Sequence, residues 1–122
     1  MRRCMFIDDS SVVRKVAKRI LNGPDFLVIE AASGSEAIGM CTTDMPDIIV
    51  VDASLPDMTS ADLIRRIRAM PAGVEPTIAI CLYEVDVGAI MRAKRAGAQD
   101  YILKPFNRSQ LLSRFRNLQM AA

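Results

Sequence analysis

The chain has 122 residues, of which 51% are hydrophobic and 25% are charged, and its formal net charge at pH 7 is +2. This length is typical of one domain, and the composition excludes a disordered tail. The small net charge gives no indication of nucleic-acid binding, and the absence of histidine excludes Ser-His-Asp catalysis, Cys-His catalysis and most transition-metal sites.

We expect no signal peptide among the amino-terminal residues. The apolar stretch at residues 4–7 is interrupted at once by Asp8-Asp9, far short of the roughly 7–15 apolar residues of a secretory signal. No apolar run approaches the roughly 20 residues of a membrane span, so we expect a cytoplasmic protein with no membrane contact. Cys4, Cys41 and Cys81 are far apart in the sequence, and we expect reduced thiols in the core.

The first predicted strand covers residues 3–7 and ends at Asp8-Asp9. A helix follows from Ser10 or Ser11 to Leu21, with apolar residues spaced three and four apart, and Asn22-Gly23-Pro24 stops it. The later predicted elements, in chain order, are a strand at 26–31, a helix at 33–43, a strand at 47–52, a helix at 60–70, a strand at 76–82, a helix at 86–96, a strand at 99–103 and a last helix capped by Asn107.

Five strands that alternate with five helices predict a single α/β domain. The run Ile48-Ile49-Val50-Val51 is typical of a strand buried on both faces of a parallel sheet. Right-handed crossovers then place helices on both faces of one parallel sheet. No linker interrupts residues 1–122, and we expect one domain without an attached effector domain.

Charged residues stand at the ends of three predicted strands. Asp8 and Asp9 follow the first strand, Asp52 ends the third, and Lys104 follows the fifth. If the strand order is 2-1-3-4-5, the three carboxylates converge, and each pair at about 4 Å repels by roughly 4 kcal/mol at an effective dielectric near 20. A hard cation such as Mg²⁺ or Mn²⁺ relieves that repulsion, and a carboxylate flanked by a cation and an ammonium can accept a phosphoryl group.

Three motifs carry a resemblance to a known family over the whole chain. They are Phe6-Ile7-Asp8-Asp9-Ser10, the segment from Ile49 to Pro56 around Asp52, and the segment from Ala96 to Phe106 that contains Lys104-Pro105. In this order and spacing they resemble the receiver domains of two-component response regulators, including the chemotaxis receiver. The resemblance implies a flavodoxin-like (βα)5 fold with strand order 2-1-3-4-5.

The resemblance also implies roles for individual residues. Asp52 would be the phosphoacceptor for a sensor histidine kinase or a phosphotransfer protein, and Lys104 would contact the phosphoryl oxygens. Mg²⁺ or Mn²⁺ would be held by Asp8, Asp9, Asp52 and the backbone carbonyl of Ser54. The protein would be a signalling switch and not a conventional enzyme, and a downstream protein would bind the face made by the fourth helix, the fifth strand and the fifth helix. Lys104-Pro105 would be a cis peptide.

The sequence departs from the family at the end of the fourth strand. Receivers usually have a threonine or serine there, and counting from Gly97 and Lys104 places Leu82 at that position, or Cys81 after a one-residue slip. Tyr83 follows where a small residue is common. We therefore expect that phosphorylation is retained and that the response is carried differently, by the loop at residues 82–87.

Other positions in the same region tune the switch in the family. Ser54 and Glu84 occupy positions that affect phosphoaspartate hydrolysis, and Tyr101 matches an aromatic switch position. A half-buried strand tyrosine is the simpler interpretation of Tyr101. The basic side chains of the third helix, Arg65, Arg66 and Arg68, are expected to point into solvent.

Two other functions are alternatives to a phosphoacceptor switch. A receiver fold kept as a phospho-independent interaction module would explain Leu82, but the complete set of Asp8, Asp9, Asp52 and Lys104 argues against it. A dehalogenase-type phosphohydrolase needs a second acid two residues after its nucleophile, where this chain has Ser54.

Overall fold

The computed structural model describes residues 1–121, which form five strands and five helices in strict alternation. They are β1 (Arg2–Ile7), α1 (Ser11–Leu21), β2 (Phe26–Ala31), α2 (Gly34–Thr43), β3 (Ile48–Asp52), α3 (Ser60–Arg68), β4 (Thr77–Leu82), α4 (Val87–Ala96), β5 (Asp100–Leu103) and α5 (Arg108–Ala121). The predicted elements are all present, with bounds that agree to within two residues. Among residues 1–121, no helix combines the length and apolar character that crossing a membrane requires.

Each helix begins where a side chain accepts a hydrogen bond from the backbone N–H three residues later. Such a bond satisfies one of the unpaired N–H groups of the first helical turn and stabilises the helix start by about 1 kcal/mol. The five capping residues are Ser10, Ser33, Thr59, Asp86 and Asn107.

The end of α3 is the main difference from the predicted bounds. The helix stops at Arg68, two residues earlier than predicted. Beyond it the chain turns back so tightly that a Cβ atom on Gly73 would clash with the carbonyl group of Ile67. Only glycine fits this close approach of two backbone segments.

The five strands form one parallel sheet in the order β2-β1-β3-β4-β5, which confirms the predicted topology. Strand β1 pairs with β3, with Ile7 beside Val51, and β3 pairs with β4, with Asp52 beside Cys81. All carboxyl ends of parallel strands lie at the same edge, so the residues that follow β1, β3 and β5 meet there.

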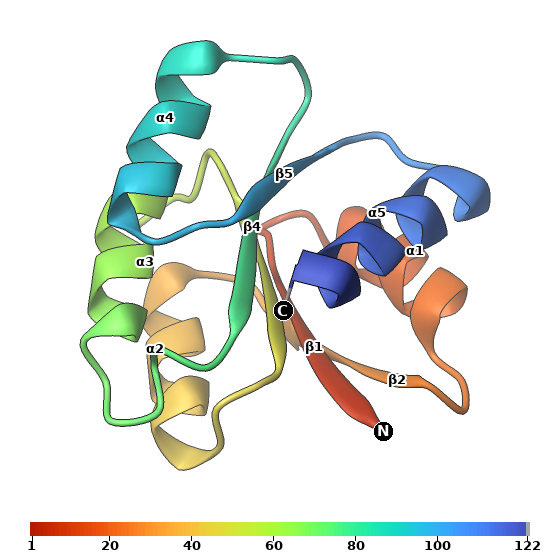
Figure 1. Cartoon of the computed structure of the whole chain (residues 1–122), viewed down its shortest axis with the longest axis horizontal. Helices are drawn as coiled ribbons and strands as arrows, with labels where there is room; N and C mark the ends of the chain where they lie inside the picture. The colour runs from red at the N-terminus through yellow and green to blue at the C-terminus, as the bar shows by residue number, and fades with distance from the viewer. Residues whose placement is uncertain (122) are drawn as a thin grey trace.

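Helices cover both faces of the sheet, as Figure 1 shows: α2, α3 and α4 lie on one side, and α1 and α5 lie on the other. Alternate strand residues serve the two layers. Ile49, Val51 and Leu82 pack in the core beneath α2, α3 and α4, whereas Val50 and Cys81 pack in the core beneath α1 and α5. The three thiols, of Cys4, Cys41 and Cys81, are free and buried.

Candidate functional site

Two carboxylates and one ammonium group form a buried cluster at the carboxyl edge of the sheet. The side chains of Asp8, Asp52 and Lys104 are each only 4–5% exposed. Lys104 Nζ lies 2.8 Å from Asp8 Oδ2 and 3.0 Å from Asp52 Oδ1, and it donates a hydrogen bond to each. Burial of a charged group costs free energy unless the group is paired, and this cluster pairs all three.

Backbone groups hold the two buried carboxylates in place. The N–H of Ser10 donates to Asp8 Oδ1 at 2.9 Å, and the N–H of Ser54 donates to Asp52 Oδ1 at 3.2 Å. Both bonds join an aspartate to the residue two positions later, which is the local turn that aspartate favours. The chain that leaves each strand therefore orients its own carboxylate locally, in addition to the long-range hydrogen bonds from Lys104.

Asp9 completes an acidic group that can bind a cation. Unlike Asp8 and Asp52 it is exposed to solvent. One carboxylate oxygen from each of Asp8, Asp9 and Asp52 lies within 4.8 Å of the others. Oxygen ligands of this charge and spacing fit a hard divalent cation such as Mg²⁺, which keeps part of its water shell.

The surroundings shift the proton affinities of the buried pair. Burial raises the pKa of the Asp52 carboxyl, the neighbouring Asp8 adds to the rise, and hydrogen bonds from Lys104 and Ser54 offset only part of it. Burial alone would lower the pKa of Lys104, but its hydrogen bonds to Asp8 and Asp52 outweigh burial and raise it. Lys104 therefore stays an ammonium. Its single positive charge does not neutralise all the carboxylates in the site, so part of their mutual repulsion remains.

The end of β4 supplies no hydroxyl to this cluster. Leu82 is 6% exposed, and its side chain packs in the core beneath α2, α3 and α4. Cys81, the alternative that the sequence left open, packs in the opposite core. Burial raises the pKa of its thiol to about 12, so Cys81 is a neutral core side chain.

Tyr83 and Glu84 follow Leu82 on the exposed loop before α4. Tyr83 is 64% exposed, yet Lys104 Nζ lies 4.7 Å from the centroid of its ring. In the sequence Tyr83 follows Leu82, the position where the family usually has a hydroxyl, but no sequence pattern predicted its contact with Lys104. The contact joins residues 21 positions apart and depends on the pairing of β4 with β5.

Tyr101 lies on β5 and is half-buried against the core beneath α2, α3 and α4. The guanidinium carbon of Arg114 lies 4.7 Å from the centroid of its ring, and Arg114 also pairs with Asp100 at 3.7 Å. The structure thus has the half-buried strand tyrosine that was the simpler interpretation, and a switching role stays a prediction. The Lys104-Pro105 peptide is cis, as the resemblance implied.

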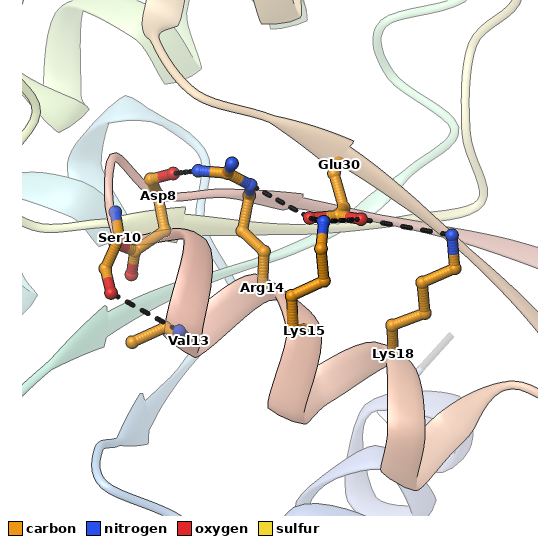
Figure 2. A network of polar contacts seen from close by, with 7 residues as sticks. All are labelled: Asp8, Ser10, Val13, Arg14, Lys15, Lys18 and Glu30. Atoms are coloured by element: carbon orange, nitrogen blue, oxygen red, sulfur yellow. Dashed lines mark hydrogen bonds and ion pairs between the residues drawn. The ribbon is translucent and has the colours of Figure 1, made fainter.

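A second polar network, which the sequence did not reveal, contacts the main chain of Asp8. Figure 2 shows Arg14 of α1 between the loop after β1 and Glu30 of β2. Arg14 Nη1 donates to the Asp8 carbonyl oxygen at 2.6 Å, and its Nε donates to Glu30 Oε1 at 3.0 Å. Lys15 and Lys18 also pair with Glu30. Glu30 lies on the next strand, so no local pattern marks the network.

The expectation that the basic residues of α3 all point into solvent is wrong for Arg68. Its guanidinium donates to the carbonyl oxygens of Gly73, Pro76 and Gly97 and to Gln99 Oε1. These acceptors lie on loops that the sequence separates widely, so helical periodicity alone could not distinguish Arg68 from its exposed neighbours Arg65 and Arg66.

Comparison with known proteins agrees with this geometry. The family model described as "Response regulator receiver domain" matches residues 4–116. The response regulator MprA of Mycobacterium avium (strain 104) is 32% identical over 116 residues, which cover 95% of this chain and 50% of MprA. The chain spans about half the length of the curated relatives it matches.

Solved structures share the whole fold. The chemotaxis protein CheY4 of Vibrio cholerae superposes with a TM-score of 0.91 at 25% identity, covering 97% of this chain and 98% of CheY4. A two-component response regulator of the LuxR family from Aurantimonas sp. SI85-9A1 gives a TM-score of 0.86 at 28% identity and covers 99% of this chain and 86% of that one. The chain belongs to the response regulator receiver domain family, whose members are phosphoacceptor signalling modules and not conventional enzymes.

Proposed function

We propose that this chain is a phosphoacceptor signalling switch of a two-component phosphorelay, in which Asp52 accepts the phosphoryl group. The observation that carries the proposal is the position of Lys104 Nζ between Asp8 and Asp52, with the Asp9 carboxylate beside them. A carboxylate nucleophile with an ammonium at one side and a cation site at the other is the arrangement that phosphoryl transfer to aspartate requires.

In the transfer, an oxygen of Asp52 forms a bond to phosphorus while the P–N bond of a phosphohistidine breaks. Lys104 and the N–H of Ser54 both bind Oδ1, which holds the carboxylate in one orientation. Among the described residues Oδ2 accepts no hydrogen bond, and this leaves it available for attack. Lys104 then stabilises negative charge on the phosphoryl oxygens.

The acidic residues fit a Mg²⁺ or Mn²⁺ ion. Asp8, Asp9 and Asp52 would hold it through their side chains, and Ser54 would add its backbone carbonyl. Such an ion neutralises charge on the phosphoryl oxygens when it is bound. The three carboxylates prepare the site for it because their mutual repulsion is relieved on binding.

The donor would be a sensor histidine kinase or a phosphotransfer protein, and the phosphorylated form would present an altered α4–β5–α5 face to a downstream protein. Exposed apolar side chains of this region support such an interface; they are Val85, Val87, Met91 and Leu103. We further propose that residues 1–122 form a single receiver domain that acts in the cytoplasm.

Intact-mass measurement tests the proposal. With acetyl phosphate and Mg²⁺ the wild-type chain should gain about 80 Da, the mass of one phosphoryl group. Asp52→Asn should gain nothing, because the amide cannot attack phosphorus. Asp47→Asn is a matched control, since Asp47 lies at the opposite end of β3; this variant should be modified like wild type.

A phospho-independent interaction module is the second candidate, and one observation favours it. Leu82 is packed in the core where the family usually has a hydroxyl that grips the phosphoryl group. A wild-type chain that takes up no phosphoryl group with Mg²⁺ present, yet still binds its partner, would favour this module over the switch.

A further inference from the structure

The aromatic ring of Tyr83 covers the ammonium group of the phosphorylation site. Lys104 is only 4% exposed, whereas Tyr83 is 64% exposed, so one side of the tyrosine faces the lysine and the remainder faces solvent. The distance of 4.7 Å from Nζ to the ring centroid is within the range of a cation–π contact. Through this contact, the exposed Tyr83 side chain touches the ammonium group that also binds Asp8 and Asp52.

Three neighbours surround the ammonium of Lys104. A lysine ammonium has three N–H donors. One donates to Asp8 Oδ2, one donates to Asp52 Oδ1, and the ring of Tyr83 lies over the group as the third neighbour. Among the described residues no oxygen accepts a third hydrogen bond from Lys104 Nζ, so the N–H on the side of the ring is the one that a new acceptor would take.

A phosphoryl group on Asp52 therefore competes with the ring. It adds oxygens that carry negative charge beside Lys104, and an ammonium binds such oxygens through charge-assisted hydrogen bonds, which are stronger than an exposed cation–π contact. The ring is the weakest of the three neighbours and is the one attached to a loop in which residues 83–88 are exposed.

The loop has space into which it can move. A cavity of 680 Å³ lies between Ala53, which follows the phosphoacceptor, and the loop residues Tyr83 to Val87, with Leu82 at its wall. The end of β4 offers no side-chain hydroxyl to a phosphoryl group in this cavity, because Leu82 is the residue there.

We propose that Tyr83 is a positioning residue: it holds Lys104 in the unphosphorylated state, and its displacement by the phosphoryl group transmits the state of Asp52 to the loop at residues 83–87. This inference rests on the proposed function. In other receivers a hydroxyl at the position of Leu82 usually couples the phosphoryl group to the following loop. In this chain the contact between the Tyr83 ring and the Lys104 ammonium would provide that coupling.

Lysine NMR signals test the resting contact directly. The chain has four lysines, Lys15, Lys18, Lys94 and Lys104, so selective ¹³C-lysine labelling of the full chain gives few signals. The side-chain protons of Lys104 should be shifted upfield by the ring current of Tyr83. Tyr83→Phe should keep the shift and Tyr83→Leu should abolish it, while Tyr101→Phe, which alters the other tyrosine, should leave it unchanged.

Beryllofluoride with Mg²⁺, a non-covalent mimic of the phosphoryl group, tests the displacement. Its binding to wild type should remove the upfield shift of Lys104. If the ring contact is lost on binding, Tyr83→Leu should bind beryllofluoride about two- to fivefold more tightly than wild type, the factor that corresponds to an exposed cation–π contact. Tyr83→Phe should bind like wild type. Because Tyr83 is exposed, these variants should fold normally.

The outcomes separate this inference from the proposed function. A Lys104 shift that is the same in wild type and Tyr83→Leu would overturn the contact, and a shift that persists in the beryllofluoride-bound protein would overturn the displacement. Failure of wild type both to bind beryllofluoride and to take up a phosphoryl group would contradict the proposed function, and the displacement with it.

Discussion

The backbone N–H of Lys104 donates a hydrogen bond to the carbonyl oxygen of Leu82 at 3.0 Å. The residue that lacks the usual hydroxyl is thus bound through its main chain to the residue that carries the ammonium of the site. The side chain of Leu82 meanwhile packs in the core beneath α2, α3 and α4. The main-chain link between β4 and β5 is therefore independent of the side chain at position 82.

The pair Leu82→Thr and Leu82→Val isolates the effect of a hydroxyl at this position, because threonine and valine have nearly the same shape. Leu82→Val should lower the free energy of unfolding by about 1 kcal/mol through lost packing, and Leu82→Thr by about 1–2 kcal/mol more if its hydroxyl stays unpaired. Urea unfolding measures both. With the phosphoryl group present, only the threonine can donate a hydrogen bond to it, so only Leu82→Thr should change the lifetime of phosphoaspartate. Equal lifetimes in the two variants would show that a hydroxyl at position 82 does not act on the phosphoryl group.

Asp9→Asn separates metal binding from folding. Since Asp9 is exposed but lies beside two other carboxylates, the substitution should leave the fold intact and, without metal, should raise the free energy of unfolding by relieving part of their repulsion. At a Mg²⁺ concentration of about ten times its Kd, wild type should gain roughly 1.4 kcal/mol, and Asp9→Asn should gain much less. Thermal unfolding with and without MgCl₂ gives both values. Glu75→Gln, which removes an exposed acid elsewhere, should respond to Mg²⁺ as wild type does; an equal response in Asp9→Asn would exclude Asp9 as a ligand.

Arg68→Met should destabilise the fold by about 2–4 kcal/mol, because it removes the donor that binds several loop carbonyl oxygens and leaves them unpaired. Arg68→Lys should recover only part of this loss, since lysine lacks the planar fork of donors. Arg66→Met is the matched control on the exposed side of α3 and should cost less than about 0.5 kcal/mol. Chemical denaturation of the three variants measures the differences, and similar values for positions 66 and 68 would contradict a structural role for Arg68.

Glu30 should make stability depend on pH in the acid range. Burial alone would raise the pKa of its carboxyl, but hydrogen bonds from Lys15 and Arg14 outweigh burial and lower it below the ordinary value of 4.5. A lowered pKa in the folded state means that the stabilisation is present above about pH 4.5 and is lost as the pH falls through the folded value. At pH 7, Glu30→Gln should cost on the order of 0.5–1 kcal/mol, typical of partly exposed ion pairs.

Urea unfolding of wild type and Glu30→Gln between pH 7 and pH 3 measures this dependence. The difference between the two proteins should shrink as the pH falls, because protonated glutamate and glutamine are both neutral. A difference that stays constant over this range would show that Glu30 acts through packing and not through its charge.

Local sequence patterns were sufficient to predict the elements and, except for the end of α3, their ends to within one residue. The run at residues 48–51 is β-branched and uniformly apolar, as expected for a strand buried on both sides, and Ser10, Ser33 and Asn107 cap helices through bonds to residues three positions away. The convergence of Asp8, Asp52 and Lys104 was also predictable once the strand order was taken from the family resemblance, because each stands at the carboxyl end of a strand. The helix caps depend on backbone geometry over a few residues, whereas the convergence follows from the order of parallel strands.

The tertiary structure alone decided the contacts that long side chains make across the fold. Arg14 reaches both the Asp8 carbonyl and Glu30, Arg68 binds the loop before β4 and the loop after α4, and Tyr83 lies over Lys104. Arginine and tyrosine side chains extend far from the backbone, and either a solvent-facing or a protein-bound orientation is compatible with the same helical or loop position. The sequence by itself determined which charged groups would meet at the sheet edge; which side chains support and cover them was decided only when distant segments came together in the folded chain.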